Sequence, residues 1–460
     1  MTMKLSSEMI KLESMSKTSH DCMIMYEKQE PKTESKQRQR RRHMLLGLGF
    51  WMQGFRCFPW MAMIFFLKDG FRLDPLTMQI LQSSASLPMV AKPVYGLLSD
   101  SFYFFGQHRI PYIAGGALLH ATSWFAIASS PSSTISVFTI IIYLLLANLG
   151  ASIVEVANDA VVTECVKQPT NTSDLQSFAW VAASIGGISG NFLGGLFVDR
   201  FSPHAMFLVF GFLLIVQFLF TISINEQSLD LPKNQSLRGI RSQISKLFAV
   251  LRKPEIHRPI LWFAASYAVI PSLTGTMFYY QTQHLNIESS VLGVSKVFGQ
   301  TTMLLWGILY NRHLKSIPPR ILISSIQGTM AVLMVSDALF VNGFHRTVLG
   351  VHDSLYVVFV SGFLDVLYMF KILPFSVLMA KLCPPGCEGS LMAFTMSAIA
   401  LACIVSGYLG VALASCVQFT VTDFSGFKKG LMIQALCTVL PLFWSSFIPN
   451  NMKPKPEKKQ

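Results

Sequence analysis

Charged residues are scarce in this sequence. Asp, Glu, Lys and Arg together make up 13% of its 460 residues, whereas hydrophobic residues make up 52% and the mean hydropathy is +0.47. Ordinary globular domains carry roughly 25% charged residues, so a soluble chain of this length could not cover its surface with so few. Disorder of the whole chain is excluded by the same numbers, because it requires low hydrophobicity and high net charge. The composition therefore indicates an integral membrane protein.

Motifs of catalytic and metal-binding sites are also missing. The sequence has no G-x-S-x-G, no Walker loop, no H-E-x-x-H and no polar domain that could hold an active site. Its ten His are dispersed, and Cys383 and Cys387, the nearest pair among eight Cys, have no further Cys or His cluster beside them. We therefore predict that the protein is not an enzyme and that it has no cofactor, no metal site and no disulfide framework.

The net charge of +13 is concentrated outside the apolar stretches. Seven Lys and Arg lie in residues 28–42, seven in 233–258 and four in 453–459. A nucleic-acid partner would require a recognisable binding fold around such basic patches, and none is present. Basic residues that flank apolar stretches are instead signals of membrane topology. The predicted partners are therefore the lipid bilayer and a small molecule, not a nucleic acid.

Apolar stretches of about 20 residues, the length that crosses a bilayer as a helix, follow one another after residue 43. The pattern predicts twelve spans, at residues 44–67, 78–99, 110–129, 135–160, 175–198, 204–224, 259–283, 290–310, 319–341, 353–379, 390–416 and 429–448. The basic linker 225–258 divides them into two six-helix halves, 44–224 and 259–448. Residues 1–43 are predicted to be a disordered cytosolic arm, and 449–460 a basic cytosolic tail. The predicted fold is thus an all-α membrane protein of twelve transmembrane helices.

Lys and Arg are unequally distributed between the two sides of this predicted bundle. With the N-terminus inside, the inner segments from Lys28 onward contain 24 of them and the outer loops contain six. Because basic residues are enriched in cytosolic loops, we predict that both termini are cytosolic. The pattern is compatible with the plasma membrane, the vacuole or the plastid envelope.

The loop between the second and third predicted spans contains residues that could act as a gate. Gly96 permits close approach of two helices, and Asp100 ends the helix at the membrane face. Arg109 begins the next helix after a tight turn at Gly106. An acid at a helix end that faces a base across a short loop can hold one conformation and release it in another. This loop resembles the signature of the major facilitator superfamily, and the related pattern at residues 307–311 agrees with a duplicated six-helix unit.

Three further segments resemble the folate-biopterin transporter family, a branch of that superfamily. They are Lys92-Pro93 before the loop, the acidic stretch Glu155–Glu164 in the fourth span, and Cys383–Gly386 with Glu388 after the tenth. The resemblance implies alternating access of two halves to a midplane site, transport of a folate or pterin, and proton symport. The chain departs from the family pattern at Ala400, where the family has Asn, which bears on substrate identity more than on fold.

Ionisable residues inside predicted spans mark candidate sites. Each costs at least ~2.5 kcal/mol at mid-membrane on insertion scales, so it should face a cavity or a charged partner. The candidates are Arg56, Lys92, Glu155, Asp159, Asp365 and Lys371. Asp365 and Lys371 are six residues apart, on different faces of one helix, so we do not expect them to pair with each other. Glu164, at the inner end of its helix, is a weaker cavity candidate.

Glu155 and Asp159 are four residues apart and therefore share one helix face. Two like charges that close in a low-dielectric environment favour the uptake of a proton by one carboxyl group, which predicts a coupling site. The alternative is that each acid pairs with Arg56 or Lys92 as a structural contact. Arg56 could equally bind a substrate carboxylate in a bidentate manner, and Phe55 beside it could stack on a flat ring.

At the level of function, two alternatives stay open beside folate or pterin transport. The same fold could carry another small organic solute, since fold constrains substrate weakly. A sensor or scaffold could also keep the helical bundle without transporting.

Overall fold

The computed structural model describes residues 32–104, 106–130, 135–166, 174–226, 245, 247–382, 388–418, 424 and 426–449. Within these residues the chain is helical, and its one β contact is an isolated bridge between Phe104 and Gln107. Most of the predicted arm, linker and tail lie outside the described residues.

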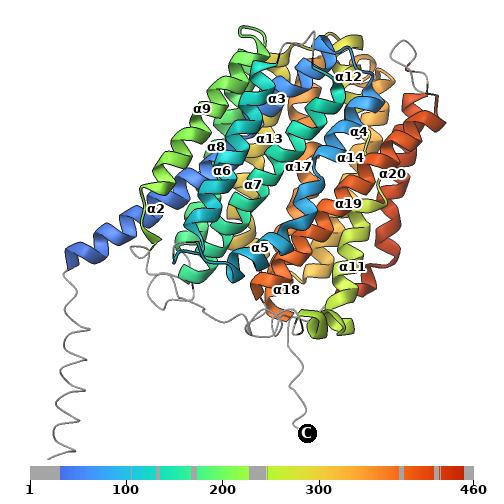
Figure 1. Cartoon of the computed structure of the whole chain (residues 1–460). Helices are drawn as coiled ribbons and strands as arrows, with labels where there is room; N and C mark the ends of the chain where they lie inside the picture. The colour runs from blue at the N-terminus through green and yellow to red at the C-terminus, as the bar shows by residue number, and fades with distance from the viewer. Residues whose placement is uncertain are drawn as a thin grey trace, which may run out of the picture.

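The first half of the chain forms a group of long helices (Figure 1). Its segments are α2 (Lys32–Phe55), α3 (Cys57–Phe65), the π-helical η1 (Phe66–Gly70), α4 (Pro75–Ala85), the 3-10 segment η2 (Leu87–Ala91), α5 (Lys92–Ser101), α6 (Ile110–Ser129), α7 (Val137–Val166), α8 (Asp174–Phe197) and α9 (Pro203–Ile222).

The second half is also helical, and its helices have more interruptions. Its segments are α11 (Pro254–Ala268), α12 (Thr274–Tyr279), η4 (Tyr280–His284), α13 (Ser289–Leu309), η5 (Tyr310–Leu314), α14 (Pro319–Val341), α15 (Phe344–Thr347), α16 (Asp353–Tyr356), η6 (Val357–Ser361), α17 (Gly362–Leu367), η7 (Tyr368–Lys371), α18 (Ile372–Leu382), α19 (Glu388–Cys416), α20 (Phe427–Phe443) and η8 (Ser445–Phe447).

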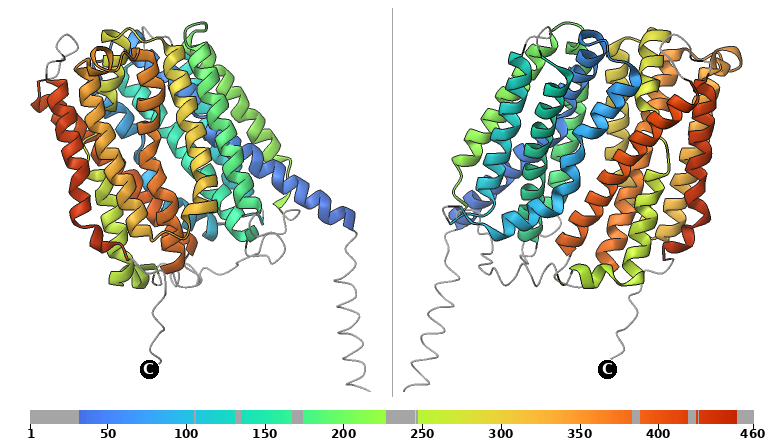
Figure 2. Two further views of the ribbon diagram at one scale, coloured as in Figure 1. Left: turned by 180° about the vertical axis from the view of Figure 1, so that it is seen from behind. Right: turned by 45° about the vertical axis from the view of Figure 1, so that its right-hand side comes forward.

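The two halves lie side by side, blue to green for the first and yellow to red for the second, in each view of Figures 1 and 2. The start of α2 and the end of α20 lie at the same end of the bundle. We call this the inner end, following the predicted orientation, and the opposite one the outer end. The cytosolic location of the termini stays a prediction.

The helices follow the predicted spans closely. Each predicted span overlaps a helix or a run of consecutive helical segments. Seven helices in the described ranges are long and apolar enough to cross a membrane; the total of twelve spans stays a prediction. One boundary differs clearly, because α2 begins at Lys32, inside the predicted disordered arm. Lys, Arg and Gln are good helix formers, and they continue the first apolar helix inward.

Prolines account for two of the interruptions. A proline cannot donate to the carbonyl four residues earlier and clashes with it. Pro59 stands four residues after Phe55, where α2 ends. Pro374 stands four residues after Phe370, which lies in the 3-10 segment η7. These breaks place Arg56 and Lys371 at irregular points of their spans.

Glycines on α8 allow unusually close helix contacts on both of its sides. A Cβ on Gly186 would lie 2.1 Å from the carbonyl oxygen of Trp51 in α2, and a Cβ on Gly195 would lie 2.7 Å from Cα of Gly293 in α13. Larger side chains at these positions would force the backbones apart. Helix α8 therefore packs tightly against its own half and against the other half.

Hydrogen bonds join the halves toward the outer end. The buried amide of Gln79 in α4 donates from Nε2 to the carbonyls of Ser272 (2.6 Å) and Gly407 (2.7 Å), and its Oε1 accepts from the backbone N–H of Gly275 (3.1 Å). Nearby, Ser289 donates to the carboxylate of Asp199. The described structure is therefore a state in which the outer ends of the two halves are in contact.

Candidate functional site

Three of the predicted ionisable residues meet in the first half. Arg56 donates from Nη1 to Oε1 of Glu155 at 2.5 Å, and Lys92 donates from Nζ to Oε2 at 2.6 Å. The second terminal nitrogen of Arg56, Nη2, donates to Oδ1 of Asn148 at 2.8 Å. Asn148 in turn donates to the carbonyl of Ala85 at 2.7 Å. We call Arg56, Lys92 and Glu155 the ion triplet.

Local breaks in the helices bring the two cations to the acid. Arg56 occupies the junction between α2 and α3, and Lys92 opens α5 directly after the 3-10 segment η2. Glu155 lies within the continuous helix α7. Two broken helices therefore present their cations to one unbroken helix that carries the acid.

The ion triplet is largely shielded. The exposed fraction of the side chain is 8% for Glu155, 17% for Arg56 and 21% for Lys92. In so dry a place an ion pair is strongly coupled, and removing one partner typically costs 3–5 kcal/mol. Glu155 is therefore positioned as in the alternative in which it forms structural ion pairs with Arg56 and Lys92.

Asp159 differs from Glu155 in having no partner. It lies one turn further along α7 and its side chain is exposed. Within the described part of the chain its carboxylate makes no hydrogen bond or ion pair, although it interacts electrostatically with Lys92 and Glu155. With Asp159 ionised, two cations balance two acids; with Asp159 protonated, the group carries one net positive charge.

Two uncharged polar residues lie on α2 and α7, close in sequence to the ion triplet. Asn158, beside Glu155 on α7, is fully buried, and its amide has no hydrogen-bond partner. Gln53, one turn before Arg56 on α2, has a buried Oε1 without a partner. Buried polar atoms are normally satisfied. These orphaned groups therefore mark the interface of α2 and α7 as a polar zone inside an otherwise apolar half.

Phe55 lies in the hydrophobic core of the first half. Its ring is 4% exposed and stacks on Trp51, with ring centroids 4.7 Å apart, and on Phe58 at 5.2 Å. Consecutive helix residues point about 100° apart, so Phe55 turns into the core of the first half while Arg56 turns to α7. In this structure the Phe55 ring faces the core and not Glu155 or Lys92, and its stacking on a substrate stays a prediction.

The loop predicted to act as a gate contains an ion pair. Arg109 donates from Nη2 to Oδ1 of Asp100 at 2.5 Å and from Nη1 to Oγ of Ser99 at 2.6 Å. Gly106 turns the loop with φ +75°, a conformation that favours glycine. Gly96 has a different role from the expected one, because a Cβ there would lie 3.5 Å from Val156, an ordinary contact. Close helix approach in this half occurs at Gly186 instead.

Glu226 completes this loop and was not predicted. Its buried carboxylate accepts the backbone N–H groups of His108, Arg109 and Ile110 at the start of α6, and it pairs with the His108 ring at 2.5 Å. Burial alone would raise the pKa of Glu226, but these hydrogen bonds lower it to about 2. A lowered carboxyl pKa contributes its full stability at pH values above the ordinary pKa of the group. That stability is lost progressively as the pH falls from the ordinary pKa through about 2. The cap is therefore constant at physiological pH.

The predicted residues of the second half do not join the ion triplet. Asp365 pairs with Lys296 across α17 and α13. Lys371 is fully buried, so it faces no open cavity in this structure. Its ammonium donates to Oε1 of Gln327 at 2.7 Å and to Oγ of Ser266 at 3.2 Å. As expected, Asp365 and Lys371 do not contact each other.

Asn148 and Asp337 are among the buried polar residues within predicted spans that sequence reasoning did not select. Asn148 stands seven residues before Glu155, two helical turns away on the same face of α7, and this spacing could have identified it. Asp337, in the ninth predicted span, accepts from the Tyr356 hydroxyl at 3.2 Å. The criterion of an acid inside a span selects Asp337 as well.

Some predicted positions cannot be placed. The side chains of Glu164 in α7 and Glu388 at the start of α19 are outside the described residues, as is the whole of Cys383–Gly386.

Comparison with known proteins identifies relatives over nearly the whole chain. A family model described as the BT1 family matches residues 53–460. The chain is 58% identical over 431 residues to the protein named probable folate-biopterin transporter 7 of Arabidopsis thaliana, covering 93% of this chain and 97% of that one. It is 30% identical over 422 residues to the folate-biopterin transporter of Synechocystis, covering 89% of this chain and 82% of the relative.

Solved structures share the fold. A crystal structure of a D-xylose-proton symporter superposes with a TM-score of 0.65 at 14% identity, covering 89% of this chain and 98% of that one. The predicted fold class is therefore confirmed: this is an all-α integral membrane protein of the major facilitator type.

Proposed function

The chain belongs to the BT1 family, and from this premise we propose that it is a secondary active transporter that carries a folate or a pterin by alternating access, coupled to protons. One observation carries the proposal: Glu155 is held between two cations while Asp159, one turn away, keeps an unpaired carboxylate. An intramembrane acid without a partner is costly unless it serves a solute or a proton.

Proton coupling follows from the charge balance of these four residues. When Asp159 takes up a proton, the group around the ion triplet gains one net positive charge. An anionic solute is then attracted to Arg56 and Lys92 more strongly. By linkage, the bound anion favours the protonated form of Asp159 to the same extent. Proton and anion therefore bind together, which is the requirement for symport.

The chemistry of the group suits a pteridine that bears a glutamate tail. The Arg56 guanidinium already forms two directed hydrogen bonds, to Glu155 and to Asn148, and a carboxylate could replace either acceptor. A carboxylate such as that of Asp159 can accept N–H groups from the edge of a pterin ring. An acid and a base at one site thus match the two ends of a folate.

The test is uptake of radiolabelled folic acid by bacteria that cannot import folate. Cells that produce this protein should accumulate the label above the empty-vector level, more at acidic than at neutral external pH, and unlabelled pterins should compete. Western blotting of the membrane fraction confirms production. Absence of uptake in cells that contain the protein in their membranes would refute folate as the solute and leave the fold unaffected.

Replacing Arg56 by Lys should separate the two ends of the substrate. Lysine keeps the charge but cannot hold a carboxylate through two parallel N–H groups. We expect Arg56→Lys to weaken competition by folate about tenfold and competition by an unconjugated pterin much less. An equal loss for both competitors would show that Arg56 acts only through its pairing with Glu155.

A further inference from the structure

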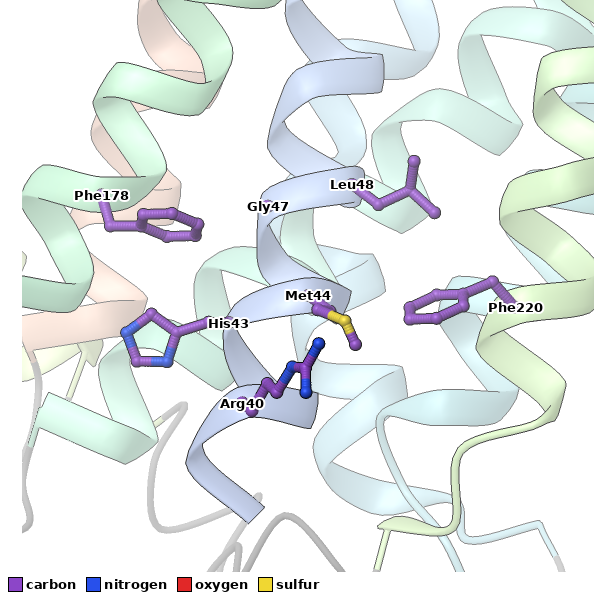
Figure 3. Close-up of a pocket in the computed structure, with 7 residues that line it drawn as sticks. All are labelled: Arg40, His43, Met44, Gly47, Leu48, Phe178 and Phe220. Atoms are coloured by element: carbon purple, nitrogen blue, oxygen red, sulfur yellow. The ribbon is translucent and has the colours of Figure 1, made fainter. Parts of the chain in front are cut away.

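A groove lies at the inner end of the first half, where α2 emerges from the bundle. Figure 3 shows it along one face of α2, with Phe178 of α8 on one side and Phe220 of α9 on the other. Its cavity volume is about 440 Å³. The α2 residues that line it have the spacing of a single helix face: Arg40, His43, Met44, Gly47 and Leu48.

The floor of the groove is apolar and depends on a glycine. Gly47 offers no side chain between the rings of Phe178 and Phe220, and a Cβ there would lie 3.0 Å from Cζ of Phe178. Met44 and Leu48 extend the apolar lining along α2. A glycine inside a helix costs about 1 kcal/mol relative to alanine. Here the missing side chain lets the Phe178 ring lie close against α2 and leaves the backbone of α2 as part of the groove floor.

The mouth of the groove is cationic. Arg40 is exposed and makes no ion pair or hydrogen bond within the described chain. In Figure 3 it lies one turn from Met44, toward the start of α2. Six Lys and Arg precede Met44 in the sequence of this helix. A free guanidinium thus stands where the apolar part of α2 gives way to its basic part.

We propose that this groove is a binding site for a phospholipid with an anionic head group, in the inner leaflet. The phosphate pairs with the Arg40 guanidinium, which matches a phosphate in a bidentate manner. One acyl chain lies over Gly47, between Phe178 and Phe220. Basic clusters directly beside a membrane helix attract anionic lipids by about 1 kcal/mol for each Lys or Arg.

A lipid fits the groove better than a free anion does. An inorganic phosphate would use Arg40 alone and leave the apolar floor in water. A zwitterionic lipid would fill the floor but gain little from the basic stretch. The combination of a cation at the mouth and an apolar hollow beneath it selects a molecule with both an anionic group and a hydrocarbon chain.

Native mass spectrometry of the full-length protein in detergent tests the site. The protein is titrated with phosphatidylglycerol, with phosphatidylcholine, and with phosphatidylglycerol plus excess inorganic phosphate. The variants are Arg40→Gln and its matched control Arg41→Gln, which makes the same charge change at the next, exposed position of α2, outside the groove. A third variant, Gly47→Leu, places a side chain against Phe178 in the floor of the groove and keeps every charge.

We expect one phosphatidylglycerol to stay bound to the wild type and to Arg41→Gln, without displacement by phosphate. Arg40→Gln should weaken this binding about tenfold. Gly47→Leu should weaken it as well. Equal losses in Arg40→Gln and Arg41→Gln would overturn the site in favour of diffuse attraction to the basic helix. Displacement by phosphate, or equal retention of phosphatidylcholine, would also overturn it. Because Arg40 is exposed and unpaired, its replacement leaves the fold intact, which gel filtration verifies.

Discussion

Asp159→Asn should abolish the accumulation of solute against a gradient while the protein stays in the membrane. Asparagine has nearly the shape of aspartate but cannot exchange a proton. Since the Asp159 carboxylate has no partner in the described structure, its replacement breaks no contact within the protein. The amide fixes the group around the ion triplet in the charge state of a protonated Asp159. Solute can still bind, but the proton gradient no longer favours its movement in one direction.

Two measurements make this result specific. Uptake of labelled solute is followed at several external pH values, and exchange of labelled for unlabelled solute is followed without a pH gradient. We expect Asp159→Asn to lose pH-dependent uptake and to retain exchange, because exchange requires no net movement of protons. Asp69→Asn serves as the control, since Asp69 is an exposed acid outside the ion triplet. Unchanged pH-dependent uptake in Asp159→Asn would refute coupling through this residue.

The first half shows how far sequence periodicity leads. The spacing of Glu155 and Asp159 predicted a shared helix face, and the scarcity of intramembrane charge selected Arg56 and Lys92 as well. All four lie in one region because a buried charge in an apolar bundle requires a counter-charge or an open space. Constraints of this kind are visible in a sequence, since they depend on residue type and on distance along one helix.

Contacts between helices were the part that the sequence could not supply. Glu226 caps α6 from beyond the sixth span, and nothing in its neighbourhood marks it as a partner of residues more than one hundred positions earlier. Phe55 and Arg56 are adjacent and point about 100° apart, yet only the packing of the helices decides that Phe55 enters the core and Arg56 reaches α7. Such pairings depend on helix rotation and crossing, which periodicity within one helix does not determine.

Glu155→Gln should be the most destabilising of the substitutions considered. It removes the anion shared by Arg56 and Lys92 and leaves two poorly hydrated cations beside each other. The loss of one partner from a buried pair costs about 3–5 kcal/mol. We therefore expect a lower yield in the membrane and a lower midpoint of thermal unfolding in detergent. Glu288→Gln, at an exposed acid directly before α13, should change neither.

A second substitution distinguishes charge imbalance from loss of shape. Lys92→Met in the Glu155→Gln background removes one of the two uncompensated cations and keeps most of the side-chain volume. If unpaired charge causes the instability, the double variant should be more stable than Glu155→Gln alone, although contacts in one network are not additive. A double variant less stable than both single variants would contradict this account. Recovery of stability without recovery of uptake would then separate the role of the ion triplet in stability from its role in transport. Arg56 can pack against a neutral partner, but it needs the Glu155 carboxylate to orient its guanidinium.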